Sequence, residues 1–128
     1  KKIILDNFQN IKNSYKPRLI NTKNIGIFCS SRRIRGNKLE GTLYSLVKHL
    51  PENSALKLHP SMYQNNSYIK KILILLEKFN RTDIFVCDSE TIIEAEMLFE
   101  KKKLIGPLTS LIKYAEIFGS SFKQINIY

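Results

Sequence analysis

The stretch Asn24–Ser30 (NIGIFCS) is apolar, contains β-branched residues and runs into a basic, glycine-containing loop. A short apolar run followed by such a loop is typical of a strand that is buried on both faces of a parallel sheet. We therefore predict that these residues form the first, buried strand of the fold.

Downstream of this strand, short β-branched runs alternate with longer stretches of helical period, which is the pattern of βαβ units. The expected fold class is α/β, a Rossmann-like, doubly wound parallel sheet of about five strands and four helices. The predicted strands are 24–30, 55–59, 83–87, 104–106 and 124–128. The first two predicted helices are 39–50 and a helix after Pro60, which has an apolar stripe at Ile69, Ile72, Leu73 and Leu76. The third is 92–102, with caps from 88–91. The fourth begins at Pro107 and ends at Gly119, with a stripe at Leu108, Leu111, Ile112 and Ala115.

Residues 1–23 are polar apart from one apolar cluster at Ile3–Leu5, so we expect a linker or lead-in segment without a role in the core. Residues 24–128 have the length of one domain. Because the chain starts at Lys1, without an initiator methionine or a signal-like stretch, we expect it to be part of a longer protein. Cys29 and Cys87 lie in strand-like runs, which predicts buried free thiols and suits a cytoplasmic protein.

The positive charge is concentrated in the amino-terminal third of the chain. The formal net charge is +10, and residues 1–38 contain ten Lys and Arg residues against one acid, Asp6, whereas residues 39–128 contain eleven against ten. Such a patch attracts nucleic acid, anionic lipid or an acidic sugar or phosphate ligand. No apolar run reaches the roughly 18 residues that a membrane-spanning helix needs, so membrane contact through this third would be peripheral.

Polar residues follow the predicted strands, at the edge where ligands bind in open parallel sheets. The pair Thr109 and Ser110 opens a predicted helix, whose amides and hydroxyls suit a phosphate. Alternatively, the two hydroxyls satisfy the helix's own backbone. The candidates at this edge are Ser30, Ser31, Arg32, Arg33 and Arg35 after the first strand, His59 and Pro60 after the second, residues 88–90 after the third, and Gly106, Pro107, Thr109 and Ser110 after the fourth.

His59 is the strongest single candidate for contact with an anion. A protonated imidazole can donate to a phosphate oxygen and offset charge that develops on a leaving phosphate. Lys57 lies two residues earlier on the same strand face, and Pro60 fixes the exit from the sheet. A lone histidine is more often structural, and His49, at a helix end near Pro51, is expected to be a surface or capping residue.

Glu94 and Glu96 could reach a ribose or sugar hydroxyl, but helical glutamates are usually exposed, and only Glu94 is kept as a candidate. The sequence contains no GxGxxG, GxxxxGK[ST] or GxSxG motif and no cluster with metal-ligand spacing. Dehydrogenase, P-loop and common hydrolase functions are therefore disfavoured.

Two segments, Lys57–Pro60 (KLHP) and Leu104–Gly119 (LIGPLTSLIKYAEIFG), resemble the bacterial sialyltransferases of the polysialyltransferase type and their lipooligosaccharide-modifying relatives. The likeness covers residues 25–128. In that family a His-Pro motif and a Ser-Ser or Ser-Thr motif lie in the carboxyl-terminal half of a GT-B fold and bind the cytidine monophosphate (CMP) part of CMP-sialic acid.

The resemblance implies that His59 and Pro60 form the first motif and that Thr109 and Ser110 form the second. Thr109 replaces the more common serine but keeps the hydroxyl. The implied reaction is an inverting transfer of sialic acid to a bacterial surface glycan of the capsule or lipooligosaccharide, with His59 and the helix at Pro107 stabilising the departing phosphate. It requires no metal and no cofactor besides the donor, CMP-sialic acid.

The family's acidic motif, which supplies the general base, belongs to an amino-terminal domain and has no counterpart in this chain. The resemblance therefore implies an incomplete glycosyltransferase that binds donor better than it turns it over. Its implied acceptor is an acidic glycan or lipooligosaccharide, and its implied place is the cytoplasm at the inner face of the bacterial membrane.

Two alternatives stay open at this point. Teichoic-acid polymerases that use CDP-glycerol also carry Lys-x-His-Pro and a hydroxyl pair before a helix, but usually with an acidic Asp-Tyr where this chain has Gly106–Leu108. A non-catalytic module that binds nucleic acid through residues 1–38 ranks third, because few aromatic residues are interleaved with the basic ones there.

Overall fold

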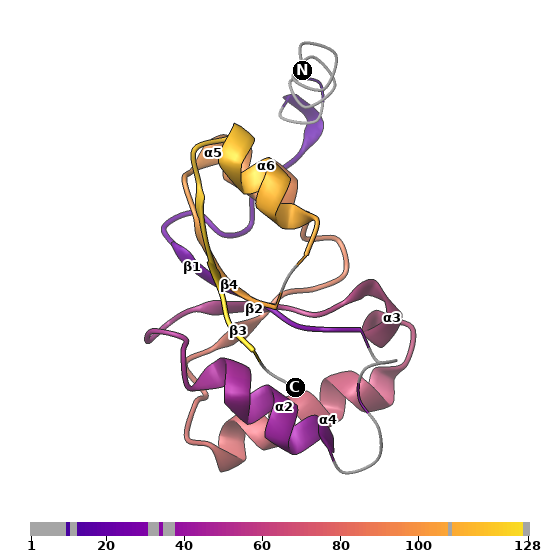
Figure 1. Ribbon diagram of the computed structural model, residues 1–128. Helices are drawn as coiled ribbons and strands as arrows, with labels where there is room; N and C mark the ends of the chain where they lie inside the picture. Colours follow the sequence, from indigo (N-terminus) through magenta and orange to yellow (C-terminus); the bar gives the residue numbers. More distant parts are fainter. Residues whose placement is uncertain (1–9, 11–12, 31–33, 35–37, 108, 127–128) are drawn as a thin grey trace.

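The computed structural model describes residues 10, 13–30, 34, 38–107 and 109–126. It confirms the α/β class, because the described strands form an all-parallel, Rossmann-like sheet in the order β3-β2-β1-β4-β5 (Figure 1). The strands are β1 (Asn24–Ile27), β2 (Ala55–Lys57), β3 (Phe85–Val86), β4 (Lys103–Gly106) and β5 (Ser121–Gln124). The described helices are α2 (Lys38–Val47), α3 (Pro60–Tyr63), α4 (Asn66–Lys78), α5 (Ile93–Phe99) and α6 (Leu111–Ile117).

The sheet is covered on both faces, and β1 lies at its centre. Ile25 and Ile27 pack in the apolar cluster that includes residues of α5 and α6, whereas Phe28 belongs to the cluster of α2 and α4. Figure 1 shows these two helix pairs on opposite sides of the strands. The run Ile25–Cys29, formed by β1 and the residues just after it, therefore contributes side chains to two different cores, which explains why it has no polar side chain.

The α2–α4 layer differs from the prediction in two places. The stripe of α4 buries Ile72 and Leu76 and half-buries Ile69, but Leu73 is exposed. A short extra helix, α3, begins at Pro60, since proline fits the first helical turn and the preceding residue, His59, supplies the side-chain cap. The predicted second strand consequently ends at Lys57 and does not include His59.

The α5–α6 layer contains shorter helices than predicted. Helix α5 ends at Phe99 rather than at residue 102, and α6 begins at Leu111 rather than at Pro107. Gly119, with φ of 76°, follows the end of α6 as predicted. The prediction placed the start of the fifth strand at Gln124, but β5 ends at that residue. The strand was misplaced because only Phe122 of this edge strand packs against the core, so its sequence has almost no apolar pattern.

The prediction that residues 1–23 play no part in the core is wrong for Leu19, which is only 1% exposed. The backbone of residues 15–22 lies against two buried charged residues. The carboxylate of Glu96, which the sequence predicted to be exposed, accepts from the amides of Arg18 and Leu19, and the ammonium of Lys102 donates to the carbonyls of Leu19 and Thr22. These bonds satisfy charges that would be costly to bury alone.

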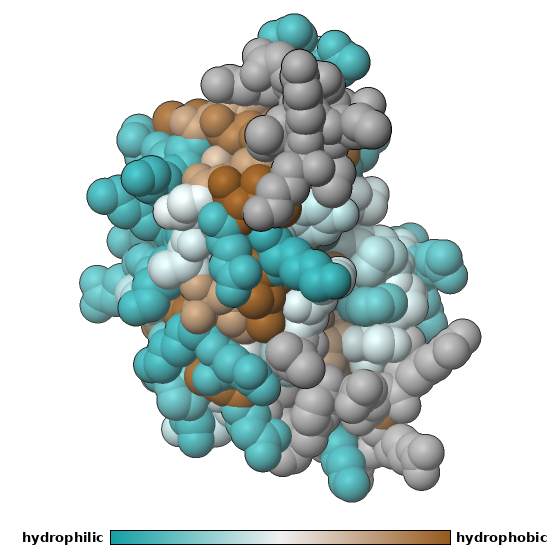
Figure 2. All heavy atoms as spheres, turned by 45° about the horizontal axis from the view of Figure 1, so that its top comes forward, coloured by the Kyte–Doolittle hydropathy of each residue, from teal (hydrophilic) through white to brown (hydrophobic). Residues whose placement is uncertain are grey.

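Among the described residues, no helix is both long and apolar enough to cross a membrane. On the face that Figure 2 shows, hydrophilic side chains surround separate brown patches where apolar side chains reach the surface. Scattered apolar side chains of this kind are ordinary on a folded domain. The exposed large ones are Ile20, Tyr44, Leu73, Ile74, Phe85, Ile92 and Ile117.

Candidate functional site

A cavity of about 760 Å³ lies beyond the carboxyl ends of the strands. The chain runs from β1 outward to β2 and β3, then crosses the sheet to β4 on the other side of β1. This reversal is the switch point at which doubly wound sheets bind ligands. The cavity is lined by the last residues of β1 and β2, the first residues of α5 and α6, and the turns next to them: Ile27–Ser30, Lys57–Pro60, Ser89, Thr91–Glu94, Pro107 and Thr109–Leu111.

His59 lies at the turn between β2 and α3. Its Nδ1 accepts a hydrogen bond from the amide of Ser61 at 3.1 Å and lies 2.9 Å from the Ser61 hydroxyl, so the imidazole caps α3. In the neutral ring the proton is then carried by Nε2. The cap therefore fixes the orientation of the ring while the opposite nitrogen stays a donor for a ligand in the cavity.

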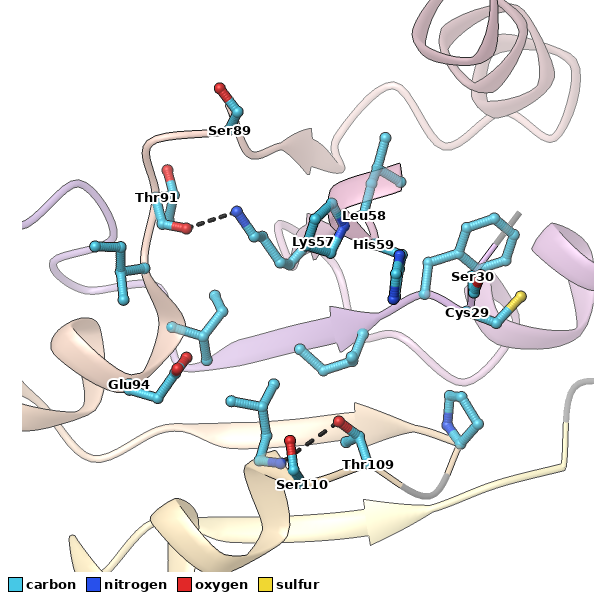
Figure 3. Close-up of a pocket in the computed structure, with 17 residues that line it drawn as sticks. Cys29, Ser30, Lys57, Leu58, His59, Ser89, Thr91, Glu94, Thr109 and Ser110 are labelled. Carbon is cyan, nitrogen blue, oxygen red and sulfur yellow. Dashed lines mark hydrogen bonds between the residues drawn. The ribbon is translucent and has the colours of Figure 1, made fainter. Parts of the chain in front are cut away.

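Lys57 lines the same cavity, but its ammonium is engaged with the protein. Nζ donates to the carbonyl of Thr91 at 2.6 Å, as Figure 3 shows, and to that of Asp88 at 3.3 Å. It also lies 4.9 Å from the ring centre of Tyr63. Burial lowers the pKa of Lys57 below its ordinary value of 10.5. Lys57 therefore connects β2 to the loop that precedes α5.

Thr109 and Ser110 reach the cavity from the turn between β4 and α6. Figure 3 shows this pair and His59 on opposite sides of β1. The Thr109 hydroxyl accepts from the Leu111 amide at 3.4 Å, and the next two amides are bonded to the carbonyls of Thr109 and Ser110. The first three amides of α6 thus have partners within the turn, and the residues of this turn that line the cavity carry the hydroxyls of Thr109 and Ser110.

Gly106 was predicted to contact the ligand, but it does not line the cavity. It lies in β4 where that strand approaches β1 closely, and a Cβ atom there would come within 2.5 Å of the carbonyl oxygen of Ile27. Real Cβ atoms do not approach backbone oxygens so closely. Glycine at this position is thus explained by packing of the two strands.

The loop between β3 and α5, residues 88–92, forms one wall of the cavity. Asp88 arranges this loop, because its Oδ1 accepts from the amides of Glu90 and Thr91 and from the Thr91 hydroxyl. The predicted capping residues therefore shape the loop, and α5 begins without a side-chain cap. Glu94, in the first turn of α5, lines the cavity as predicted.

Seven of the nine predicted site residues line this one cavity. Ser31 lies outside the described residues, as do Arg32, Arg33 and Arg35. The seven are Ser30, Lys57, His59, Pro60, Glu94, Thr109 and Ser110. The structure thus brings the residues of both motifs to one place.

Comparisons with protein-family models, curated proteins and solved structures found no match for this chain. The site must therefore be interpreted from its own geometry. Among the residues described, no group of three or more His, Cys, Asp or Glu side chains could hold a metal ion.

Tyr63, which was not predicted from the sequence, connects two strand ends next to the site. Its hydroxyl donates to the Cys87 carbonyl at 2.7 Å and accepts from the Leu58 amide at 3.2 Å, so it joins the ends of β2 and β3. Burial raises the pKa of Tyr63 to about 12, and it raises that of the Cys87 thiol to about 12 as well. Both groups keep their protons near neutral pH. A tyrosine four residues after a histidine carries no signal that would reveal this role.

Proposed function

We propose that this chain is the donor-binding domain of a glycosyltransferase, and that its cavity binds the CMP part of CMP-sialic acid. The observation that carries the proposal is the meeting of His59 with Thr109 and Ser110 in one cavity at the switch point of the sheet. These are the residues through which the chain resembles sialyltransferases of the polysialyltransferase and lipooligosaccharide type. In that comparison, the domain corresponds to the carboxyl-terminal half of a GT-B fold.

The chemistry of the cavity suits a phosphate ester with a sugar attached. In the tautomer that caps α3, Nε2 of His59 carries the proton and donates to a phosphate oxygen, and the hydroxyls of Thr109 and Ser110 add donors on the other side of β1. Glu94 offers a carboxylate to ribose or sugar hydroxyls. Apolar residues such as Ile92 and Leu111 provide surface for the base or the sugar ring.

In the proposed reaction, the bond between the anomeric carbon of sialic acid and the phosphate oxygen breaks, and CMP departs with the electron pair. The acceptor hydroxyl forms the new bond from the opposite face and loses its proton to a general base. His59 stabilises the charge that develops on the departing phosphate. We assign the base to a separate amino-terminal domain, since this chain contains no counterpart of the family's acidic motif.

Calorimetric titration of the full chain with CMP tests the proposal, with CDP-glycerol and a short oligonucleotide as competing ligands. His59→Ala should weaken CMP binding roughly tenfold to hundredfold, the cost of losing a hydrogen bond to a charged group. His49→Ala is the matched control, because His49 is exposed at the end of the α2 segment and should leave binding unchanged.

Three outcomes would contradict the proposal: equal CMP affinity in His59→Ala and the wild-type chain, tighter binding of CDP-glycerol than of CMP, or binding of the oligonucleotide alone. The second would favour a glycerophosphotransferase and the third a nucleic-acid-binding module.

A further inference from the structure

The cavity wall at residues 88–92 is held from two sides. On the cavity side, the ammonium of Lys57 binds the carbonyls of Asp88 and Thr91. On the outer side, the segment 15–19 lies against the same loop, although more than seventy positions separate them in the sequence. The amino-terminal segment is therefore part of the support of the cavity.

Tyr15 makes the central contact of this outer support. Its hydroxyl donates to the buried carboxylate of Glu96 at 2.5 Å and accepts from the amide of Ile92, a residue of the wall, at 3.1 Å. Burial, followed by the hydrogen bond to Glu96, raises the pKa of Tyr15, so the phenol stays a donor at neutral pH. One hydroxyl thus joins the segment, the wall and the first turns of α5.

Arg18 adds charge to the same contact. Its guanidinium donates to the Glu90 carboxylate at 3.1 Å and lies 3.6 Å from the carboxylate of Asp88. Asp88 is the residue that arranges the wall through the amides of Glu90 and Thr91. Displacement of the segment would release the wall from both Tyr15 and Arg18 at once.

We propose that Tyr15 is a positioning residue for the cavity, and that docking of segment 15–19 sets the shape of wall 88–92 in which the ligand binds. The part of this inference that concerns CMP rests on the proposed function. If docking favours the binding-competent wall, ligand binding must favour docking to the same extent, because coupling between two sites is reciprocal.

Hydrogen exchange of the full chain tests the inference before any ligand is added. Tyr15→Phe removes only the hydroxyl, and the amides of residues 88–92 should then exchange at least about tenfold faster, with the largest change at Ile92. Tyr44→Phe is the matched control, since Tyr44 is an exposed tyrosine on α2 that packs against Phe79. Unchanged exchange of residues 88–92 in Tyr15→Phe would overturn the inference.

Titration with CMP then tests the coupling. Tyr15→Phe should weaken CMP binding roughly threefold to tenfold, and saturating CMP should slow exchange of the Arg18 and Leu19 amides in the wild-type chain. Ile72→Val, which removes one methyl group from the core on the other face of the sheet, should leave the CMP affinity unchanged.

The outcomes separate the two proposals. If the wild-type chain does not bind CMP, the proposed function is wrong. The hydrogen-exchange rates of residues 88–92 without ligand still test the role of Tyr15 in that case. Equal CMP affinity in Tyr15→Phe and the wild-type chain would overturn the positioning role of Tyr15. So would a loss of CMP affinity in Ile72→Val as large as the loss in Tyr15→Phe.

Discussion

The turn after β2 and the turn after β4 deliver the two halves of the candidate site in different ways. At residues 57–63, His59 uses one ring nitrogen to cap α3 and keeps the other for a ligand, while Lys57 and Tyr63 fix the surrounding strand ends. At residues 106–111, the Thr109 hydroxyl is bonded to the next helix, whose first amides are already engaged.

This difference indicates how binding energy should be divided between the turns. A group held rigidly by its neighbours, with a donor left over, meets a ligand without first giving up a bond. The Thr109 hydroxyl also keeps its proton to donate, but that proton rotates about the C–O bond, so its direction is set only when a ligand binds. We therefore expect His59 to contribute most of the affinity for CMP. The conformation of the turn after β4 should depend mainly on the close packing of β4 against β1.

The largest effect is expected for Gly106→Ala in the β4 turn, and it should be an effect on stability. The new methyl group would meet the carbonyl oxygen of Ile27, so we expect a loss of about 2–4 kcal/mol in the free energy of unfolding. Urea denaturation followed by circular dichroism measures it.

Gly41→Ala is the control for that experiment. Nothing lies within 4 Å of a Cβ atom added at this helical glycine, and alanine should raise stability by about 0.5–1 kcal/mol. If Gly106→Ala were equally stable and only weakened ligand binding, Gly106 would be a ligand contact rather than a packing residue.

Lys57→Met tests whether Lys57 and His59 have separate roles, with Lys57 stabilising the fold and His59 binding the ligand. Methionine keeps much of the apolar stem but leaves the carbonyls of Asp88 and Thr91 without this donor, so the free energy of unfolding should fall by about 1–2 kcal/mol. CMP affinity should fall far less than in His59→Ala. A loss of affinity as large as that of His59→Ala would instead make Lys57 a direct ligand contact.

The pH dependence of stability in the wild-type chain and Lys57→Met gives a second test of this residue. Burial lowers the pKa of Lys57, so in the range just below 10.5 the unfolded chain binds more protons than the folded one. The wild-type chain should therefore gain stability relative to Lys57→Met as the pH rises through that range. A relative loss over the same range would mean that the folded state favours the charged ammonium.

Thr109→Val should have the smallest effect. The variant keeps the shape of threonine and removes the hydroxyl, which should cost about 0.5–1 kcal/mol of stability and weaken CMP binding about twofold to fivefold. Thr109→Ser keeps the hydroxyl and should bind like the wild-type chain. A loss of affinity that matches His59→Ala would remove the difference between the two turns.

The sequence was sufficient to predict the parallel sheet, because its central strands are buried on both faces and form continuous apolar runs. It was also sufficient to place His59, Thr109 and Ser110 at one edge, since the ends of parallel strands share an edge. It was poor at the sheet's margin, where β5 buries little more than Phe122, and at helix ends such as Leu111, where local turns compete with the helix.

The amino-terminal segment was missed for a different reason. Glu96 and Lys102 are charged residues, and such residues are rarely buried unless they are paired. Besides the side chains of Tyr15 and Glu100, their partners are backbone amides and carbonyls of residues 18–22, and backbone groups leave no mark in the sequence of that segment. The apolar pair Leu19 and Ile20, of which only Leu19 is buried, is the one hint within residues 18–22 that the segment has a buried face.

The most direct test of the shared binding site uses nuclear magnetic resonance, because the chain contains only two histidines, His49 and His59. CMP is titrated into labelled protein while the ring signals of both histidines and the amide signal of Ser110 are followed. We predict that His59 and Ser110 shift together with a single dissociation constant and that His49 does not move. Equal responses of the two histidines, or different dissociation constants for His59 and Ser110, would show that the two turns do not bind one ligand.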